Sequence, residues 1–129
     1  MIQIKNLSKV FSGKEDVQAL ENINIDILKT DICGIIGMSG AGKSTLLRCM
    51  ALLDKPTSGS IIIDGNDISS LKGKDLIEHR KQIGVIFQGY HLLMQRTVYQ
   101  NIAFPLELNY DSKEKIHEKV VQLLSLVGL

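Results

Sequence analysis

The sequence has little of several residue types that would point to a particular class of protein. It contains no tryptophan, two prolines and two cysteines among its 129 residues. Cys33 and Cys49 are too few for the disulfide framework of a small secreted domain, and both fall in stretches that we expect to be buried. The formal net charge is only +1, so the overall charge gives no reason to expect a nucleic-acid partner.

Long hydrophobic runs are also missing. No apolar run approaches the roughly 18 residues that a bilayer-spanning helix needs. The first residues lack the basic and apolar regions of a secretory leader. We therefore expect a cytoplasmic protein that reaches the inner face of a membrane only through a partner.

What the sequence does have is one glycine-rich stretch, residues 37–45, which reads GMSGAGKST. It matches the pattern G-x-x-x-x-G-K-[ST] at every fixed position. The preceding residues 31–36 are predicted to form a short buried strand, and the following residues 44–53 a helix. A strand, a glycine-rich loop and a helix in this order are typical of a phosphate-binding site.

The residue types in this loop suit a nucleotide triphosphate. Glycines lack a Cβ, so their backbone N–H groups can approach phosphate oxygens closely. The N-terminus of the following helix adds unpaired N–H groups and the positive end of its dipole. Lys43 supplies a charge for the β- and γ-phosphates, and Ser44 a hydroxyl for Mg²⁺. The predicted nucleotide-binding residues of the loop are Gly37, Met38, Ser39, Gly40, Ala41, Gly42, Lys43, Ser44 and Thr45.

Two further residues are candidates for the same site. Gln88 follows residues 82–87, an apolar run predicted to be a second core strand that could run parallel to the first. Ligands bind at the carboxyl ends of strands in open parallel sheets, so the Gln88 amide could coordinate Mg²⁺ or orient a water. Phe11 ends the first predicted strand, where its ring could either stack on adenine or belong to the core.

The order of the predicted elements indicates an α/β fold in three parts. Residues 1–30 are interpreted as an antiparallel β-subdomain, because isoleucines occupy every second position between residues 23 and 27. Residues 31–88 are interpreted as a P-loop core with an inserted hairpin, and residues 89–129 as the start of a helical subdomain. The predicted class is therefore a P-loop NTPase-like partial sheet with an N-terminal antiparallel β-subdomain and the start of a helical subdomain.

The last part is predicted to hold two helices. Residues 97–108 form the first, which Pro105 should bend or end. Asp111 and Glu114 could open the second as a variant of the capping box. Helical spacing predicts one apolar face on that helix, made of Ile116, Val120, Leu123, Leu124 and Val127.

The loop at residues 89–96 is unusually apolar. It carries Tyr90, Leu92, Leu93 and Met94, which is too much apolar surface for a free loop. These side chains either pack on helices of this chain or form a docking patch for another protein. The residues alone leave both interpretations open.

The chain resembles the ATP-binding subunit of ABC transporters over its whole length. The resemblance rests on Phe11 in the stretch LSKVF, on the loop at residues 37–45, on PTSGS at residues 56–60 and on IFQ ending at Gln88, which is similar to the family's Q-loop. The stretches FPLEL and LLSLVGL resemble the methionine importers of this family. Residues around the Q-loop also resemble lipoprotein and macrolide exporters.

The resemblance implies a role for each candidate residue. Phe11 would stack on adenine, Lys43 and the loop amides would hold the phosphates of ATP, and Ser44 with Gln88 would hold Mg²⁺. The loop after Gln88 would contact the membrane-spanning transporter subunit. A second copy of the ATP-binding subunit would close over the γ-phosphate.

The sequence departs from the family pattern after these motifs. Its 129 residues contain no L-S-G-G-Q signature, no acidic strand end with a catalytic Glu and no switch His. We therefore expect the N-terminal part of an ATP-binding domain, with no catalytic residue of its own, that binds ATP without turnover. The strand at residues 33–36 should then have an unpaired apolar edge. A different P-loop enzyme, such as a small-molecule kinase, and a non-catalytic nucleotide-binding module are the alternatives.

Overall fold

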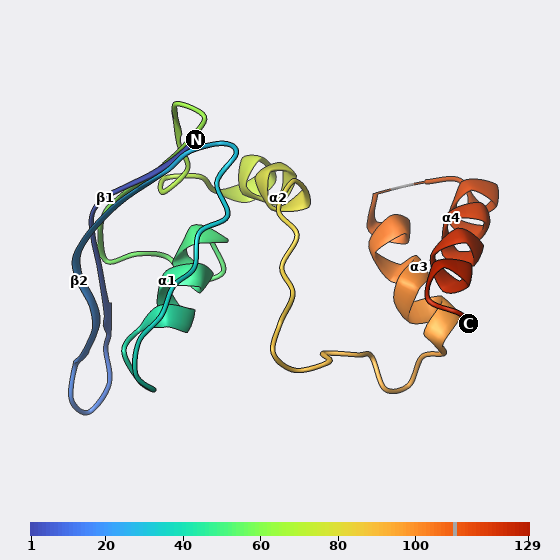
Figure 1. The fold of residues 1–129 in the computed structure, drawn as a ribbon, viewed down its shortest axis with the longest axis horizontal. Helices are drawn as coiled ribbons and strands as arrows, with labels where there is room; N and C mark the ends of the chain where they lie inside the picture. The colour runs from blue at the N-terminus through green and yellow to red at the C-terminus, as the bar shows by residue number, and fades with distance from the viewer. Residues whose placement is uncertain (110) are drawn as a thin grey trace. The chain divides into compact units, whose positions relative to one another are not determined.

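The computed structural model describes residues 1–109 and 111–129. It divides into two compact units, Met1–Val85 and Ile86–Leu129 (Figure 1). The first unit holds a sheet and the glycine-rich loop, and the second holds two helices. None of the helices among these residues is both long enough and apolar enough to cross a membrane.

The first unit is built on a four-stranded antiparallel sheet. Its strands are β1 (Ile2–Phe11), β2 (Val17–Ile27), β3 (Ser58–Ile63) and β4 (Asn66–Asp67). The strand order is β2-β1-β3-β4, so β1 lies between two neighbours. Asp64 and Gly65, both at positive φ, turn β3 into β4 as their sequence predicts. This sheet confirms the predicted antiparallel β-subdomain and the hairpin.

Both Ile4 and Leu7 of β1 are buried, although strict alternation would put residues three apart on opposite faces. The pairing of β1 with β2 shifts register between these two residues, and Asn6 takes a φ of +50°. A shift of this kind inserts an extra residue and rotates the following side chains to the other face. Both apolar side chains therefore reach the same core.

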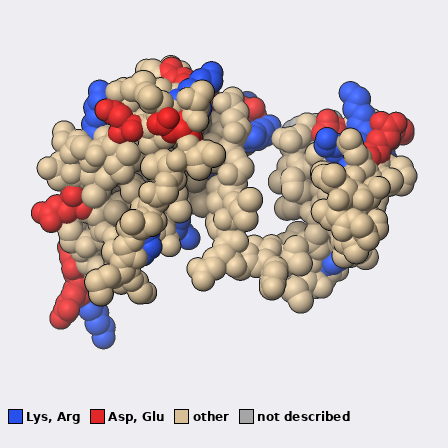
Figure 2. Space-filling view, viewed as in Figure 1, with Lys and Arg blue, Asp and Glu red and all other residues tan. Residues whose placement is uncertain are grey.

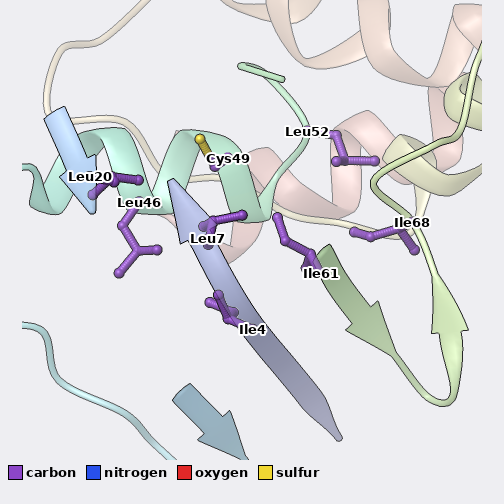
Figure 3. Packing of buried hydrophobic residues seen from close by; sticks show 8 residues of the cluster. All are labelled: Ile4, Leu7, Leu20, Leu46, Cys49, Leu52, Ile61 and Ile68. Carbon is purple, nitrogen blue, oxygen red and sulfur yellow. The ribbon is translucent and has the colours of Figure 1, made fainter. Parts of the chain in front are cut away.

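Helix α1 (Lys43–Met50) covers this face of the sheet. Leu46 and Cys49 of α1 meet side chains from β1, β2 and β3 (Figure 3). Burial raises the pKa of the Cys49 thiol, which behaves as a small core hydrophobe as expected. The buried cluster consists of Ile4, Leu7, Leu20, Leu46, Cys49, Leu52, Ile61 and Ile68.

The two predicted core strands at residues 31–36 and 82–87 are not formed, and this part of the sequence interpretation is wrong. Ile32 and Ile86 are fully exposed, and Cys33, predicted to be buried, is exposed as well. A strand needs a neighbour to complete its ladder of hydrogen bonds, and neither segment has one among the described residues. Only Ile35 of the first segment packs against the core.

Helix α2 (Gly73–Lys81) is short and polar and buries none of its residues. Its Arg80 guanidinium donates a hydrogen bond to the carbonyl of Leu52, which follows α1. This contact joins α2 to the segment that follows α1, the helix that packs on the sheet.

The second unit contains α3 (Val98–Leu108) and α4 (Lys113–Leu126). Thr97 caps α3 in a capping box with Gln100, and the helix continues through Pro105. Ser112, and not Asp111, caps α4, because its hydroxyl accepts from the N–H of Lys115 at 3.4 Å. The predicted cap was therefore one residue too early.

The two helices pack through a small core of Ala103, Ile116 and Val120. Leu124 of the predicted apolar face packs against it. Leu123 and Val127 of the same face are exposed. Helix α3 thus covers only part of the apolar face of α4.

The end of α1 is held by an ion pair whose strength should depend on pH. The Arg48 guanidinium donates to both carboxylate oxygens of Asp54, at 2.6 and 3.1 Å. These hydrogen bonds hold the pKa of Asp54 below its ordinary value. A lowered pKa in the folded chain means that the pair stabilises the fold above the unfolded pKa of about 3.9, and that this contribution is lost as the pH falls further.

We therefore expect Asp54→Asn to melt at a lower temperature than the unmodified chain at pH 7 and at about the same temperature near pH 2. Thermal unfolding followed by circular dichroism at a series of pH values measures this difference. Asp16→Asn, in the exposed turn between β1 and β2, is the matched control and should show no such convergence. A difference for Asp54→Asn that stays constant with pH would contradict the assignment.

Candidate functional site

The glycine-rich loop is anchored on the sheet at Gly42. This residue has a φ of +83° and is the N-cap of α1. A Cβ at this position would lie 2.4 Å from the carbonyl oxygen of Ala19 in β2. Only glycine fits this close approach, so the motif's last glycine sets the start of α1 against the second strand. By contrast, a Cβ at Gly40 would meet nothing within 4 Å.

The N-terminus of α1 lies open. Gly42 has no side chain to cap the helix, and the first turn of α1 contains no acidic residue. The N–H groups of this turn, together with the positive end of the helix dipole, therefore remain available to a negatively charged ligand. This is the arrangement that the sequence motif predicts for a phosphate.

The Lys43 side chain bonds to the backbone of its own loop. Its Nζ donates to the carbonyl oxygens of Gly37 at 2.7 Å and of Met38 at 2.6 Å. An ammonium has three protons, so one remains for a ligand oxygen. The loop carbonyls thus hold the charge within the loop, next to the uncapped start of α1.

The remaining loop residues differ in exposure. Ser44 is exposed, so its hydroxyl is available to a hard cation such as Mg²⁺, whereas Thr45 is half-buried at the first turn of α1. Met38, Ser39 and Ala41 are exposed around the glycines. The fold therefore brings the predicted residues 37–45 together as one loop that could hold a polyphosphate and a metal ion.

Gln88 is exposed and belongs to the second unit, whereas Ser44 belongs to the first. The expectation that both side chains hold Mg²⁺ stays a prediction. The amide oxygen of Gln88 is of the right chemical type for such a ligand.

Phe11 ends β1 as expected, but the alternative that it belongs to the core is wrong. Its side chain is 42% exposed and lies outside the buried cluster. The ammonium of Lys9 lies 4.8 Å from the centre of the ring. A partly exposed ring can stack on a flat ligand.

Lys9 was missed in the sequence interpretation, although a signal for it was present. Residues two apart in a strand lie on one face, so the spacing of Lys9 and Phe11 could have indicated that they are neighbours. The partner of its ammonium, the carbonyl of Lys55 at 2.7 Å, lies 46 residues away and could not be predicted from spacing.

The apolar loop after Gln88 is exposed and is held at its base. Tyr90 and Met94 are almost fully exposed, so packing on helices of the second unit does not account for them. The Asn101 side chain accepts from the N–H of Leu93 and donates to the carbonyls of Leu93, Arg96 and Thr97, at 2.8 to 3.2 Å.

Figure 2 shows almost no charged side chains over the segment between α2 and α3, in which Arg96 is the only charged residue. An exposed, apolar and nearly uncharged segment favours the docking interpretation of this loop.

Solved structures share this fold. The chain superposes with a TM-score of 0.88 and 34% sequence identity on the ATP-binding cassette MJ0796, solved as a dimer in a post-hydrolysis state bound to ADP and Pi. A second dimeric structure of that bacterial ABC transporter cassette gives a TM-score of 0.87. Both superpositions cover all of this chain and 58% of the solved one.

Curated relatives with similar sequences are also ATP-binding proteins of transporters. The chain is 57% identical to the methionine import ATP-binding protein MetN of Mannheimia succiniciproducens and 54% identical to that of Desulfitobacterium hafniense. The alignments cover all of this chain and 38% of each relative, so the chain spans well under half the length of these proteins. Residues 20–129 also match the sequence model of the ABC transporter family. The sequence of the phosphate loop, the fold and this match together show that the chain belongs to the ABC transporter family.

Proposed function

We propose that this chain is the N-terminal part of an ATP-binding subunit that couples ATP to the transport of an amino acid, namely the import of methionine. The observation that carries the proposal is the loop at residues 37–45, in which two loop carbonyls hold the ammonium of Lys43, the first residue of a helix that has no side-chain cap and no acidic residue in its first turn. The identity to several methionine import proteins, between 52 and 57%, supports the choice of substrate.

In the proposed complex the loop amides and Lys43 hold the phosphates, and Ser44 with Gln88 holds Mg²⁺. The metal would neutralise charge on the phosphate oxygens. Phe11 offers its exposed face to adenine. No residue of this chain is assigned as the base that activates water, so we propose binding without turnover for these 129 residues.

The proposed partners follow from the exposed apolar loop and from the solved relatives. Tyr90, Leu92 and Met94 would dock on a membrane-spanning subunit, with Asn101 keeping the loop in place. A second ATP-binding subunit would complete the site, as the dimeric cassettes suggest. The protein would then act at the cytoplasmic face of the membrane.

The experiment that tests this function is uptake of radiolabelled methionine. Deleting the gene that contains this sequence in its own host should abolish high-affinity methionine uptake, and a plasmid that carries the whole gene should restore it. The alternative suggested by the sequence, an exporter of lipoprotein or macrolide type, predicts unchanged methionine uptake and increased macrolide sensitivity instead. Unchanged uptake in the deletion strain would overturn the proposed substrate and direction.

A further inference from the structure

One face of the Phe11 ring is occupied by a charge that the fold holds in place. The Lys9 ammonium lies 4.8 Å from the ring centre and donates a hydrogen bond of 2.7 Å to the carbonyl of Lys55. Lys9 and Phe11 belong to β1, whereas Lys55 belongs to the segment after α1. The cation is thus fixed between the ring and a separate part of the chain.

The segment that holds Lys9 is itself tied to β1. The N–H of Thr57 donates to the carbonyl of Ser8 at 2.9 Å, and the Thr57 hydroxyl accepts from the N–H of Val10 at 3.0 Å. Next to Lys55, Asp54 forms its two hydrogen bonds with Arg48 of α1. The Lys55 carbonyl is therefore a rigid acceptor, and the Lys9 side chain has little freedom to leave the ring.

A fixed cation on one face changes what the other face can bind. It draws the π-electrons of the ring toward itself, which makes the free face less repulsive to the electron-rich face of a second aromatic ring. It also restricts the motion of Phe11 before any ligand arrives, so less entropy is lost on binding.

We propose that Lys9 is a positioning and specificity residue for the nucleobase: it holds and polarises Phe11 so that the ring face opposite the ammonium stacks on a purine. The inference rests on the proposed function, because it concerns the base of the nucleotide that the loop would bind. Lys9 acts through Phe11 and does not touch the nucleotide.

The test compares a ligand that has a base with one that lacks it. The dissociation constants of Mg-ATP and of magnesium tripolyphosphate are measured calorimetrically for the full chain and its variants. Lys9→Met keeps the length of the side chain and removes the charge, and it should weaken ATP binding about 3- to 10-fold while tripolyphosphate binding stays unchanged. Lys9→Arg should bind ATP as the unmodified chain does, since a guanidinium also stacks on a ring.

The controls separate positioning from stability. Lys5→Met, an exposed position on the same strand, should leave both constants unchanged. In a Phe11→Leu background, Lys9→Met should have no further effect on ATP binding.

Three results would overturn the inference. They are an equal loss for both ligands, a full effect of Lys9→Met without the Phe11 ring, and unchanged ATP binding in Lys9→Met. If the unmodified chain fails to bind either ligand, the proposed function fails together with this inference. If the unmodified chain binds both ligands but Lys9→Met leaves the ratio of the two dissociation constants unchanged, only the inference fails.

Discussion

Replacing Lys43 with alanine is expected to abolish detectable binding of Mg-ATP while leaving the fold intact. The ammonium is the only full positive charge in the loop at residues 37–45, and it belongs to the first residue of α1, a helix with no side-chain cap at its N-terminus. Loss of a hydrogen bond between charged groups costs about 1.5–3 kcal/mol, which is roughly a 10- to 150-fold loss of affinity. Loss of the charge opposite several phosphate oxygens should bring the total to the upper end of this range or beyond.

The measurement is a calorimetric titration of Mg-ATP with competition by ADP, accompanied by a thermal unfolding curve. Lys29→Ala, in the exposed turn that follows β2, removes the same charge away from the loop and should bind ATP as the unmodified chain does. Binding by Lys43→Ala within about threefold of the unmodified chain would show that Lys43 does not contact the phosphates.

Replacing Gly59 with alanine is expected to destabilise the first unit severely. Gly59 lies in β3 with a φ of +83°, and a Cβ there would lie 2.4 Å from the carbonyl oxygen of Asn6 and 2.6 Å from the Cα of Leu7. These are backbone atoms of β1, which cannot move aside without separating two hydrogen-bonded strands. Separating these strands would expose Leu7 and Ile61, which are both fully buried. A loss of more than about 4 kcal/mol is expected, which is exceptional for a single substitution.

Gly65→Ala is the matched control for this prediction. Gly65 has nearly the same φ, +84°, but a Cβ there would meet nothing within 4 Å. Its substitution should cost only the strain of a left-handed backbone, about 1–2 kcal/mol. Urea unfolding of both variants gives the comparison. Equal losses of stability in the two would mean that the close approach of Gly59 to β1 is not what requires glycine.

Several parts of this fold could be predicted because their signals act over a few residues. The motif at residues 37–45 specifies its own chemistry, since glycine, lysine and serine are recognised by type and spacing. The turn at Asp64 and Gly65 and the helical spacing in α4 are equally local. Even there, the capping residue of α4 was misplaced by one position, because Asp111 and Ser112 are both good caps and only the backbone path selects between them.

The two predicted strands at residues 31–36 and 82–87 show what local sequence signals cannot predict. Both are apolar enough for buried strands, yet Ile32 and Ile86 are exposed. An apolar run indicates that a segment favours burial and strand pairing. The pairing requires a neighbouring strand, and the described residues supply none for these two segments. The phosphate loop keeps its shape without them, because Gly42 rests on β2 and Leu46 enters the core.

The sequence by itself determined the ligand chemistry of the loop, the antiparallel hairpins and the presence of the helices, because these depend on residues close together in the chain. Only the tertiary structure decided that Ile4 and Leu7 share one face, that Gly59 touches β1, and that the Lys55 carbonyl holds Lys9 over Phe11. Each of these features depends on the register of β1 against β2 or β3, or on its contact with the segment after α1. Local spacing carries no information about that register, since many alignments of two strands satisfy the same alternation of apolar and polar residues.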